Sequence, residues 1–97
     1  MVSDGTAKRM KVIYTGRVQG VGFRFTTCRL ASLFCVTGYV KNLMNGDVEL
    51  VAEGTEQQLN DLLHEIKGSH LGRYISREQV RWSAAGGHYE TFGILYG

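Results

Sequence analysis

Residues 16–24 read GRVQGVGFR and join a predicted strand to a predicted helix. Arg24 stands where the helix should begin, and the helix dipole makes a cation there unfavourable by about 0.3–1 kcal/mol. An anion held between Arg24 and the helix amides would remove this cost. We therefore interpret the segment, with three glycines in seven positions, as a loop that binds something small and negatively charged.

The segments on either side of the loop have opposite periodicities. Residues 8–15 alternate and contain β-branched and aromatic side chains, which is typical of a strand. From Arg24 to about Val36, apolar residues recur at helical spacing. The buried stripe of this helix is expected to consist of Phe23, Thr27, Leu30, Ala31 and Phe34.

A hairpin and a second helix are predicted next. Residues 38–43 and 47–53 read as strands joined at Asn45-Gly46, a strong hairpin signal because both residues tolerate positive φ. Thr55 and Gln58 have the spacing of a capping box, so a helix should begin there and run to about Lys67, with Gly68 as its stop. Its apolar face would be Leu59, Leu62, Leu63 and Ile66.

The remaining chain reads as two more strands. Residues 73–83 and about 90–96 are strand-like, separated by a glycine-rich turn over 84–88. The order β-α-β-β-α-β, with one short terminal strand added, predicts an α+β fold of the ferredoxin-like type. We expect an antiparallel sheet with both helices on one face, in a single domain covering residues 1–97, with residues 1–7 as a tail.

Composition narrows the class of protein. The chain has 97 residues, 43% hydrophobic and 21% charged, which indicates one small globular domain. A net charge of only +2 argues against a broad nucleic-acid-binding face. No apolar run is long enough to span a membrane, and the polar start lacks a signal peptide, so a cytoplasmic location is expected.

Cysteine and histidine offer no obvious site. Cys28 and Cys35 would lie about 10.5 Å apart along the predicted helix, too far for a disulfide, and their spacing fits no zinc motif. His64, His70 and His88 have no ligand-spaced partner and read as surface residues. We therefore expect no metal and no cofactor.

Known phosphate loops do not match residues 16–24. The Walker A loop needs a lysine that is missing here, and the dinucleotide fingerprint needs a third glycine where Phe25 stands. RNA-recognition domains share the predicted topology, but residues 48–52 lack their strand aromatics. A short nest of backbone N–H groups for one phosphate-sized group remains, with the planar fork of Arg24 beside it.

Two motifs resemble those of the acylphosphatase family. GRVQGVGFR at residues 16–24 is similar to the family's phosphate loop, and GYVKNLMNGDV at residues 38–48, followed by Gly54, is similar to its second motif. The resemblance covers about residues 8–96. It differs at Tyr14, where an aliphatic residue is usual, and at Gly68-Ser69, where Gly-Pro is familiar.

The resemblance implies hydrolysis of carboxyl-phosphate mixed anhydrides to a carboxylate and inorganic phosphate, with Arg24 and Asn42 as catalytic residues. Backbone amides of the loop would bind the phosphate oxygens, and Asn42 would position the attacking water. The substrate-binding residues are then Gln19, Gly20, Val21, Gly22 and Phe23. The partners expected are a small acyl phosphate and inorganic phosphate, with no nucleic acid or membrane, and the chain is expected to be a monomer.

Other interpretations stay open at this point. The domain could bind a phosphate or carboxyl phosphate without turnover, as a sensor, or it could be part of a larger protein, because similar domains head the carbamoyl-transferring hydrogenase-maturation proteins. Arg17 and Lys41 are read as solvated charges near the loop, and Trp82 and Tyr96 as packing residues with wet edges.

Overall fold

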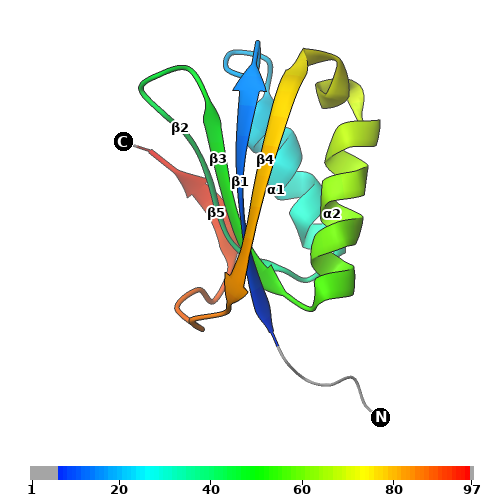
Figure 1. Cartoon of the computed structure of the whole chain (residues 1–97), viewed down its shortest axis with the longest axis vertical. Coiled ribbons are helices and arrows are strands. Elements are labelled where there is room, and N and C mark those ends of the chain that lie inside the picture. The colour runs from blue at the N-terminus through cyan, green and yellow to red at the C-terminus, as the bar shows by residue number, and fades with distance from the viewer. Residues whose placement is uncertain (1–6, 97) are drawn as a thin grey trace.

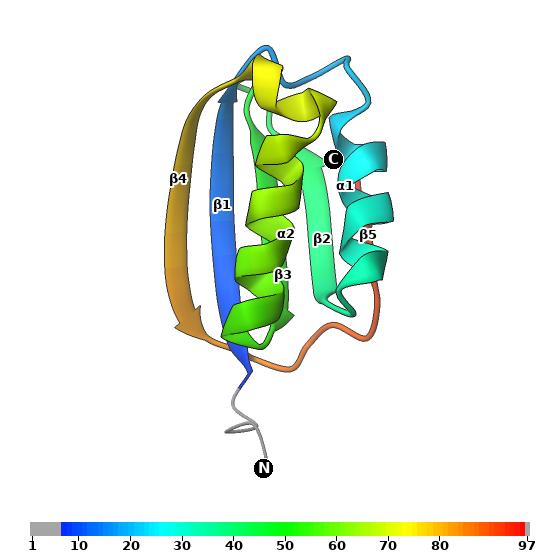
Figure 2. The same ribbon diagram turned by 90° about the vertical axis from the view of Figure 1, so that its right-hand side faces the viewer.

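The structure is a computed structural model that describes residues 7–96. The expected N-terminal tail, residues 1–7, lies outside this range except for Ala7. The described chain forms a sheet and two helices that pack on one of its faces (Figures 1 and 2). In chain order the elements are β1 (Lys8–Gly16), α1 (Phe23–Leu33), β2 (Thr37–Asn42), β3 (Val48–Gly54), α2 (Glu56–Gly68), a 3-10 helix (His70–Tyr74), β4 (Ile75–Ala84) and β5 (Phe92–Leu95).

The sheet has the order β4-β1-β3-β2-β5. The first four strands in this order are antiparallel to their neighbours, which confirms the ferredoxin-like fold. The short β5 runs parallel to β2, with Lys41 opposite Leu95, so the complete sheet is mixed rather than purely antiparallel. This pairing brings the C-terminal end of β5 beside the end of β2 that carries Asn42.

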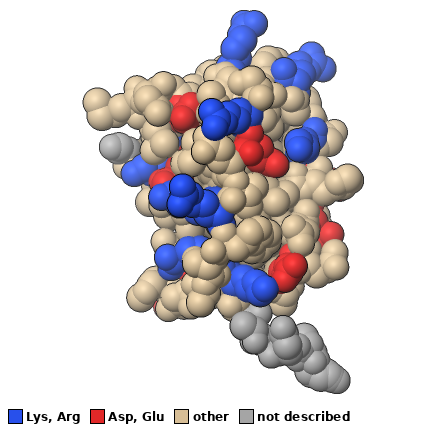
Figure 3. All heavy atoms as spheres, viewed as in Figure 1, with Lys and Arg blue, Asp and Glu red and all other residues tan. Residues whose placement is uncertain are grey.

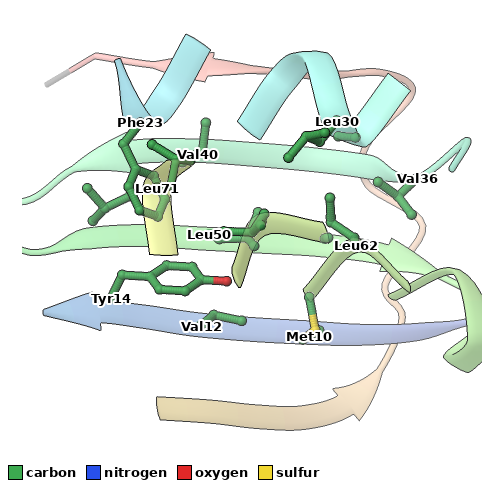
Figure 4. Close-up of a cluster of buried hydrophobic side chains, with 14 of the residues drawn as sticks. Met10, Val12, Tyr14, Phe23, Leu30, Val36, Val40, Leu50, Leu62 and Leu71 are labelled. Atoms are coloured by element: carbon green, nitrogen blue, oxygen red, sulfur yellow. The ribbon is translucent and has the colours of Figure 1, made fainter. Parts of the chain in front are cut away.

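The core lies between the helices and the sheet. Side chains alternate along β1, so that Met10, Val12 and Tyr14 are fully buried under the helices. Figure 4 shows them facing side chains from α1 and α2 such as Leu30 and Leu62. Tyr14, the unusual residue before the loop, packs its ring against Phe23 with centroids 5.0 Å apart. The first residue of α1 is thereby fixed against the sheet.

Helix α1 ends earlier than the sequence predicted. It stops at Leu33, with Phe34 as its C-cap, so the expected extension to Val36 is wrong. Cys35 adopts a positive φ of 58°, the left-handed conformation that ends a helix and that glycine more often supplies. Cys28 and Cys35 therefore do not share one helix, and both thiols are free. Burial raises the pKa of the Cys28 thiol.

The connection after α2 is more regular than the loop expected at Ser69–Gly72. The Ser69 hydroxyl donates to the carbonyl of Ile66 (2.7 Å) and accepts from the N–H of Leu71 (3.1 Å). It thus ends α2 and starts the 3-10 helix, and residues 73 and 74 belong to that helix rather than to β4. No helix within residues 7–96 is long and apolar enough to cross a membrane.

Candidate active site

A hollow of about 220 Å³ opens where the 16–24 loop, the start of α1 and the ends of β2 and β5 meet. Its lining combines backbone-exposing glycines, two polar side chains and several apolar ones. The residues are Val18, Gly20, Gly22, Phe23, Arg24, Phe25, Asn42, Ile94 and Tyr96. Five of the residues expected at the site from the sequence line it together, and Gln19 and Val21 lie beside them in the loop.

The loop backbone leaves donors unused. Gly20 and Gly22 have φ angles of 81° and 79°, and Gly22 is the N-cap of α1 without a side-chain cap. A Cβ at either glycine would meet nothing within 4 Å, so the left-handed backbone, rather than lack of space, calls for glycine. Within residues 7–96, none of the backbone N–H groups of residues 20–25 donates a hydrogen bond. Such a run of free donors at a helix start is suited to an anion.

Arg24 is the cation at this helix start. It is half-buried, and no carboxylate within residues 7–96 comes within 4 Å of its guanidinium. The guanidinium instead lies over the ring of Tyr96, 5.2 Å from the centroid. A ring face attracts a cation but does not neutralise it, so the positive charge stays available to a ligand.

Asn42 is the last residue of β2 and reaches the same hollow from the sheet. It is half-buried, and its side-chain amide makes no hydrogen bond within residues 7–96. An amide of this kind can both donate to a phosphate oxygen and accept from a water molecule.

Gln19 ties the loop to the hairpin that carries Asn42. Its side-chain N–H group donates to the carbonyls of Leu43 and Asp47, each at 2.8 Å. Asp47 is held in turn by its own N–H, which donates to the side chain of Asn45 at 3.0 Å. The side chain of Gln19 therefore holds the hairpin against the loop. Only its backbone is left to contact a ligand.

Four lining residues were not assigned to the site from the sequence. Val18 and Ile94 are apolar contributors from the loop and β5, while Phe25 and Tyr96 are exposed aromatic residues. The interpretation of Tyr96 as a packing residue is wrong, because 77% of it is exposed. Val18 and Phe25 lie in or next to the loop motif, so their position in the sequence was the available signal for them. Ile94 and Tyr96 reach the hollow through the parallel pairing of β5 with β2, for which the sequence gives no local signal.

Some of the charged groups elsewhere form ion pairs. Figure 3 shows Lys and Arg side chains in separate groups with acidic side chains among them on the face of the molecule in that view. Ion pairs join Lys8 to Glu56 (2.9 Å), Arg9 to Glu53 (2.8 Å) and Lys11 to Glu49 (3.2 Å). Within residues 7–96, no three His, Cys, Asp or Glu residues are grouped so that they could hold a metal ion.

Several shifted pKa values belong to groups outside the hollow. Burial, together with the hydrogen bond that its hydroxyl donates to Glu49, raises the pKa of Tyr39 to about 12. Burial opposes ionisation of Glu53, but hydrogen bonds from Gly86, Arg9 and Gly87 outweigh it and hold its pKa below the usual range. The hollow itself contains no carboxylate, histidine or cysteine among its lining residues. Any chemistry there would therefore rest on positioning and charge.

Comparison with known proteins places the chain in a family. The acylphosphatase family model matches residues 10–94. The chain is 40% identical over 93 residues to an acylphosphatase of Salinibacter ruber, an alignment that covers 96% of this chain and 98% of that protein. It is 42% identical over 89 residues to one of Methylococcus capsulatus, covering 91% and 96%.

Solved structures agree. The crystal structure of acylphosphatase from Bacillus subtilis superposes with a TM-score of 0.85 at 32% identity, covering 92% of this chain and 99% of that one. Full-length HypF in a phosphate- and nucleotide-bound form superposes with a TM-score of 0.80 at 26% identity, but the match covers only 12% of that chain. The sequence motifs, the fold and the matches that span nearly the whole of the acylphosphatases agree: the chain belongs to the acylphosphatase family, enzymes that hydrolyse acyl phosphates.

Proposed function

We propose that the chain hydrolyses acyl phosphates without a metal ion, with the 16–24 loop, Arg24 and Asn42 as its machinery. One observation carries the proposal. The loop and helix start with their free N–H groups, the guanidinium of Arg24 and the amide of Asn42 meet at one hollow, and within residues 7–96 neither side chain has an ion-pair or hydrogen-bond partner. Such a set of donors matches the charge and size of a phosphoryl group.

The proposed reaction needs little from the protein beyond placement. Attack of water on phosphorus forms one P–O bond and breaks the P–O bond to the carboxylate, which is a good leaving group. The loop amides and Arg24 stabilise the charge on the equatorial oxygens, and Asn42 orients the water. Because an amide is not a base, the water's proton passes to an oxygen of the substrate's own phosphate. No side chain with a tuned pKa is then required.

The test measures phosphate release from acetyl phosphate and benzoyl phosphate in the presence of a chelator. We expect wild-type turnover that the chelator leaves unchanged. Arg24→Ala and Asn42→Ala should each lower kcat/KM by about 10²–10³, because each removes a group that acts on the transition state. Arg29→Ala, on the exposed face of the same helix, and Asn60→Ala, on α2, are matched controls that should retain activity.

Wild-type rates in the Arg24 or Asn42 variant would overturn the assignment of that residue, and loss of activity with chelator would overturn the metal-free mechanism. A chain that binds phosphate but hydrolyses neither substrate would be the sensor considered above. We further propose that the catalytic unit is a monomer.

A further inference from the structure

Two exposed aromatic rings stand at the edge of the hollow. Phe25 is 74% exposed and Tyr96 is 77% exposed. The other large hydrophobic residues with comparable exposure in the described chain, such as Leu33 and Met44, do not line the hollow. Exposed apolar side chains scattered singly need no explanation, but two aromatic rings and Ile94 around one polar hollow form a group that a ligand could cover.

The two rings reach the hollow from different elements. Phe25 is the third residue of α1 and directly follows Arg24. Tyr96 directly follows β5, whose parallel register with β2 places Leu95 opposite Lys41 and hence Tyr96 near Asn42. The contact between Tyr96 and the guanidinium of Arg24 fixes this ring at the phosphate end of the hollow. The apolar side chains therefore line the same hollow as the polar ones, and Phe25, Ile94 and Tyr96 are called the acyl rim below.

The chemistry of an acyl phosphate indicates that its acyl group would contact the acyl rim. In an acyl phosphate a single bridging oxygen separates phosphorus from the carbonyl carbon. If the phosphate lies on the amides of residues 20–25, the acyl group lies within reach of the rim, because the rim side chains line the same hollow. A methyl group covers little of these side chains, whereas a flat ring can lie against Phe25 or Tyr96 in the offset or edge-on geometry that aromatic pairs prefer.

We infer that Phe25, Ile94 and Tyr96 form an acyl-binding subsite that favours acyl phosphates whose acyl group is flat and apolar over those with a small acyl group. This inference rests on the proposed function, because it needs the phosphate to occupy the loop. The rim is open to solvent on its outer side, since both rings are mostly exposed. The preference therefore arises from contact between the acyl group and these side chains, and no side chain within residues 7–96 limits the length of the acyl group.

The experiment compares kcat/KM for benzoyl phosphate and acetyl phosphate in the full chain and in single variants. The ratio of the two values is the readout, because the intrinsic reactivities of the substrates cancel when variants are compared. We expect Phe25→Ala to lower the ratio by about 2–10-fold, the range expected when one aromatic contact is lost. Leu33→Ala, an exposed apolar residue of the same helix outside the hollow, should leave the ratio unchanged.

Tyr96 needs a second measurement because it also contacts Arg24. Competitive inhibition by phenylphosphonate and methylphosphonate reports binding without turnover. Tyr96→Leu should lower the preference for the phenyl compound, and Tyr96→Phe should keep it. If the wild-type chain hydrolyses both substrates but neither ratio changes in the Phe25 and Tyr96 variants, the acyl subsite is wrong and the proposed function stands. If the wild-type chain hydrolyses neither substrate, the proposed function fails first.

Discussion

The two helices begin in opposite ways at opposite ends of the sheet (Figures 1 and 2). Helix α2 begins with a complete capping box. The Thr55 hydroxyl accepts from the N–H of Gln58 (3.1 Å), and the Gln58 side chain accepts from the N–H of Thr55 (2.9 Å). Glu56 adds a negative charge to its first turn. Helix α1 begins at Phe23, and its N-cap Gly22 provides no side-chain cap. Its first turn has no acidic residue and carries Arg24 instead.

The residues around the two helix starts also differ in whether their polar groups have hydrogen-bond partners. Just before α2, the buried carboxylate of Glu53 accepts hydrogen bonds from Arg9 Nε (2.8 Å) and from the N–H groups of Gly86 (3.0 Å) and Gly87 (3.1 Å). At the start of α1, the backbone N–H groups of residues 20–25 have no acceptor within residues 7–96. The start of α2 thus has its polar groups satisfied within the chain, whereas the start of α1 leaves its donors available, as the proposed phosphate site requires.

The largest effect should come from making the start of α1 resemble that of α2. Arg24→Glu places a carboxylate in the first turn, as Glu56 does in α2. We expect kcat/KM for acyl phosphates to fall by about 10³ or more, because a cation is replaced by an anion that repels the phosphate. The free energy of unfolding should rise by about 0.3–1 kcal/mol, because the new charge suits the helix dipole. Steady-state kinetics and denaturant unfolding of one preparation measure both. A variant that lost activity and stability together would show that Arg24 is structural.

At the other end, Glu53→Gln should lower stability by about 2 kcal/mol at neutral pH, because charge-assisted hydrogen bonds are lost from a buried site. The pKa of Glu53 is lower in the folded chain than in the unfolded one. Its contribution is therefore complete above the ordinary glutamate value of about 4.3 and is lost as pH falls through that region toward the lower folded value.

Denaturant unfolding of both proteins between neutral and acidic pH tests this linkage. The difference in the free energy of unfolding between wild type and Glu53→Gln should become smaller as the pH falls. A gap that stayed constant, or widened in acid, would show that the ionised carboxylate is not what holds residues 86 and 87.

The smallest effect is expected from the capping box. Thr55→Ala should cost about 1 kcal/mol of stability, because one helix N–H loses its acceptor. Activity at temperatures well below unfolding should not change, since Thr55 does not line the hollow. Thermal unfolding and kcat/KM measure the two quantities. Thr55→Ser, which keeps the hydroxyl, is the matched control. A marked fall in kcat/KM for Thr55→Ala would contradict the claim that the start of α2 contributes to stability and not to activity.

Much of the fold could be predicted because local signals agreed with it. The Thr55–Gln58 capping box is found as predicted, and the hairpin turns where Asn45-Gly46 indicated, although only Gly46 of that pair has a positive φ. The loop glycines Gly20 and Gly22 take the positive φ angles that glycine allows. The end of α1 could not be predicted, because Cys35 takes a left-handed conformation that its residue type does not announce. The 3-10 helix after Ser69 likewise depends on a hydroxyl that bonds on both sides.

The candidate site was predictable only where it is local. Arg24 and the loop glycines are neighbours in sequence. Asn42 was predicted because residues 38–48 resemble the second motif of the family. Tyr96 reaches the hollow through the parallel pairing of β5 with β2, which depends on tertiary contacts rather than on a local pattern, and Phe25 lines the same hollow from α1. The aromatic rim of the hollow therefore became visible only in the folded chain.

The most direct test of the open helix start is a titration with inorganic phosphate followed by amide resonances in NMR spectra. We predict saturable shifts of the N–H resonances of residues 20–25, much smaller shifts for residues 55–58, and a large loss of affinity in Arg24→Ala. Binding of phosphate that leaves residues 20–25 unshifted, or that survives unchanged in Arg24→Ala, would contradict the account.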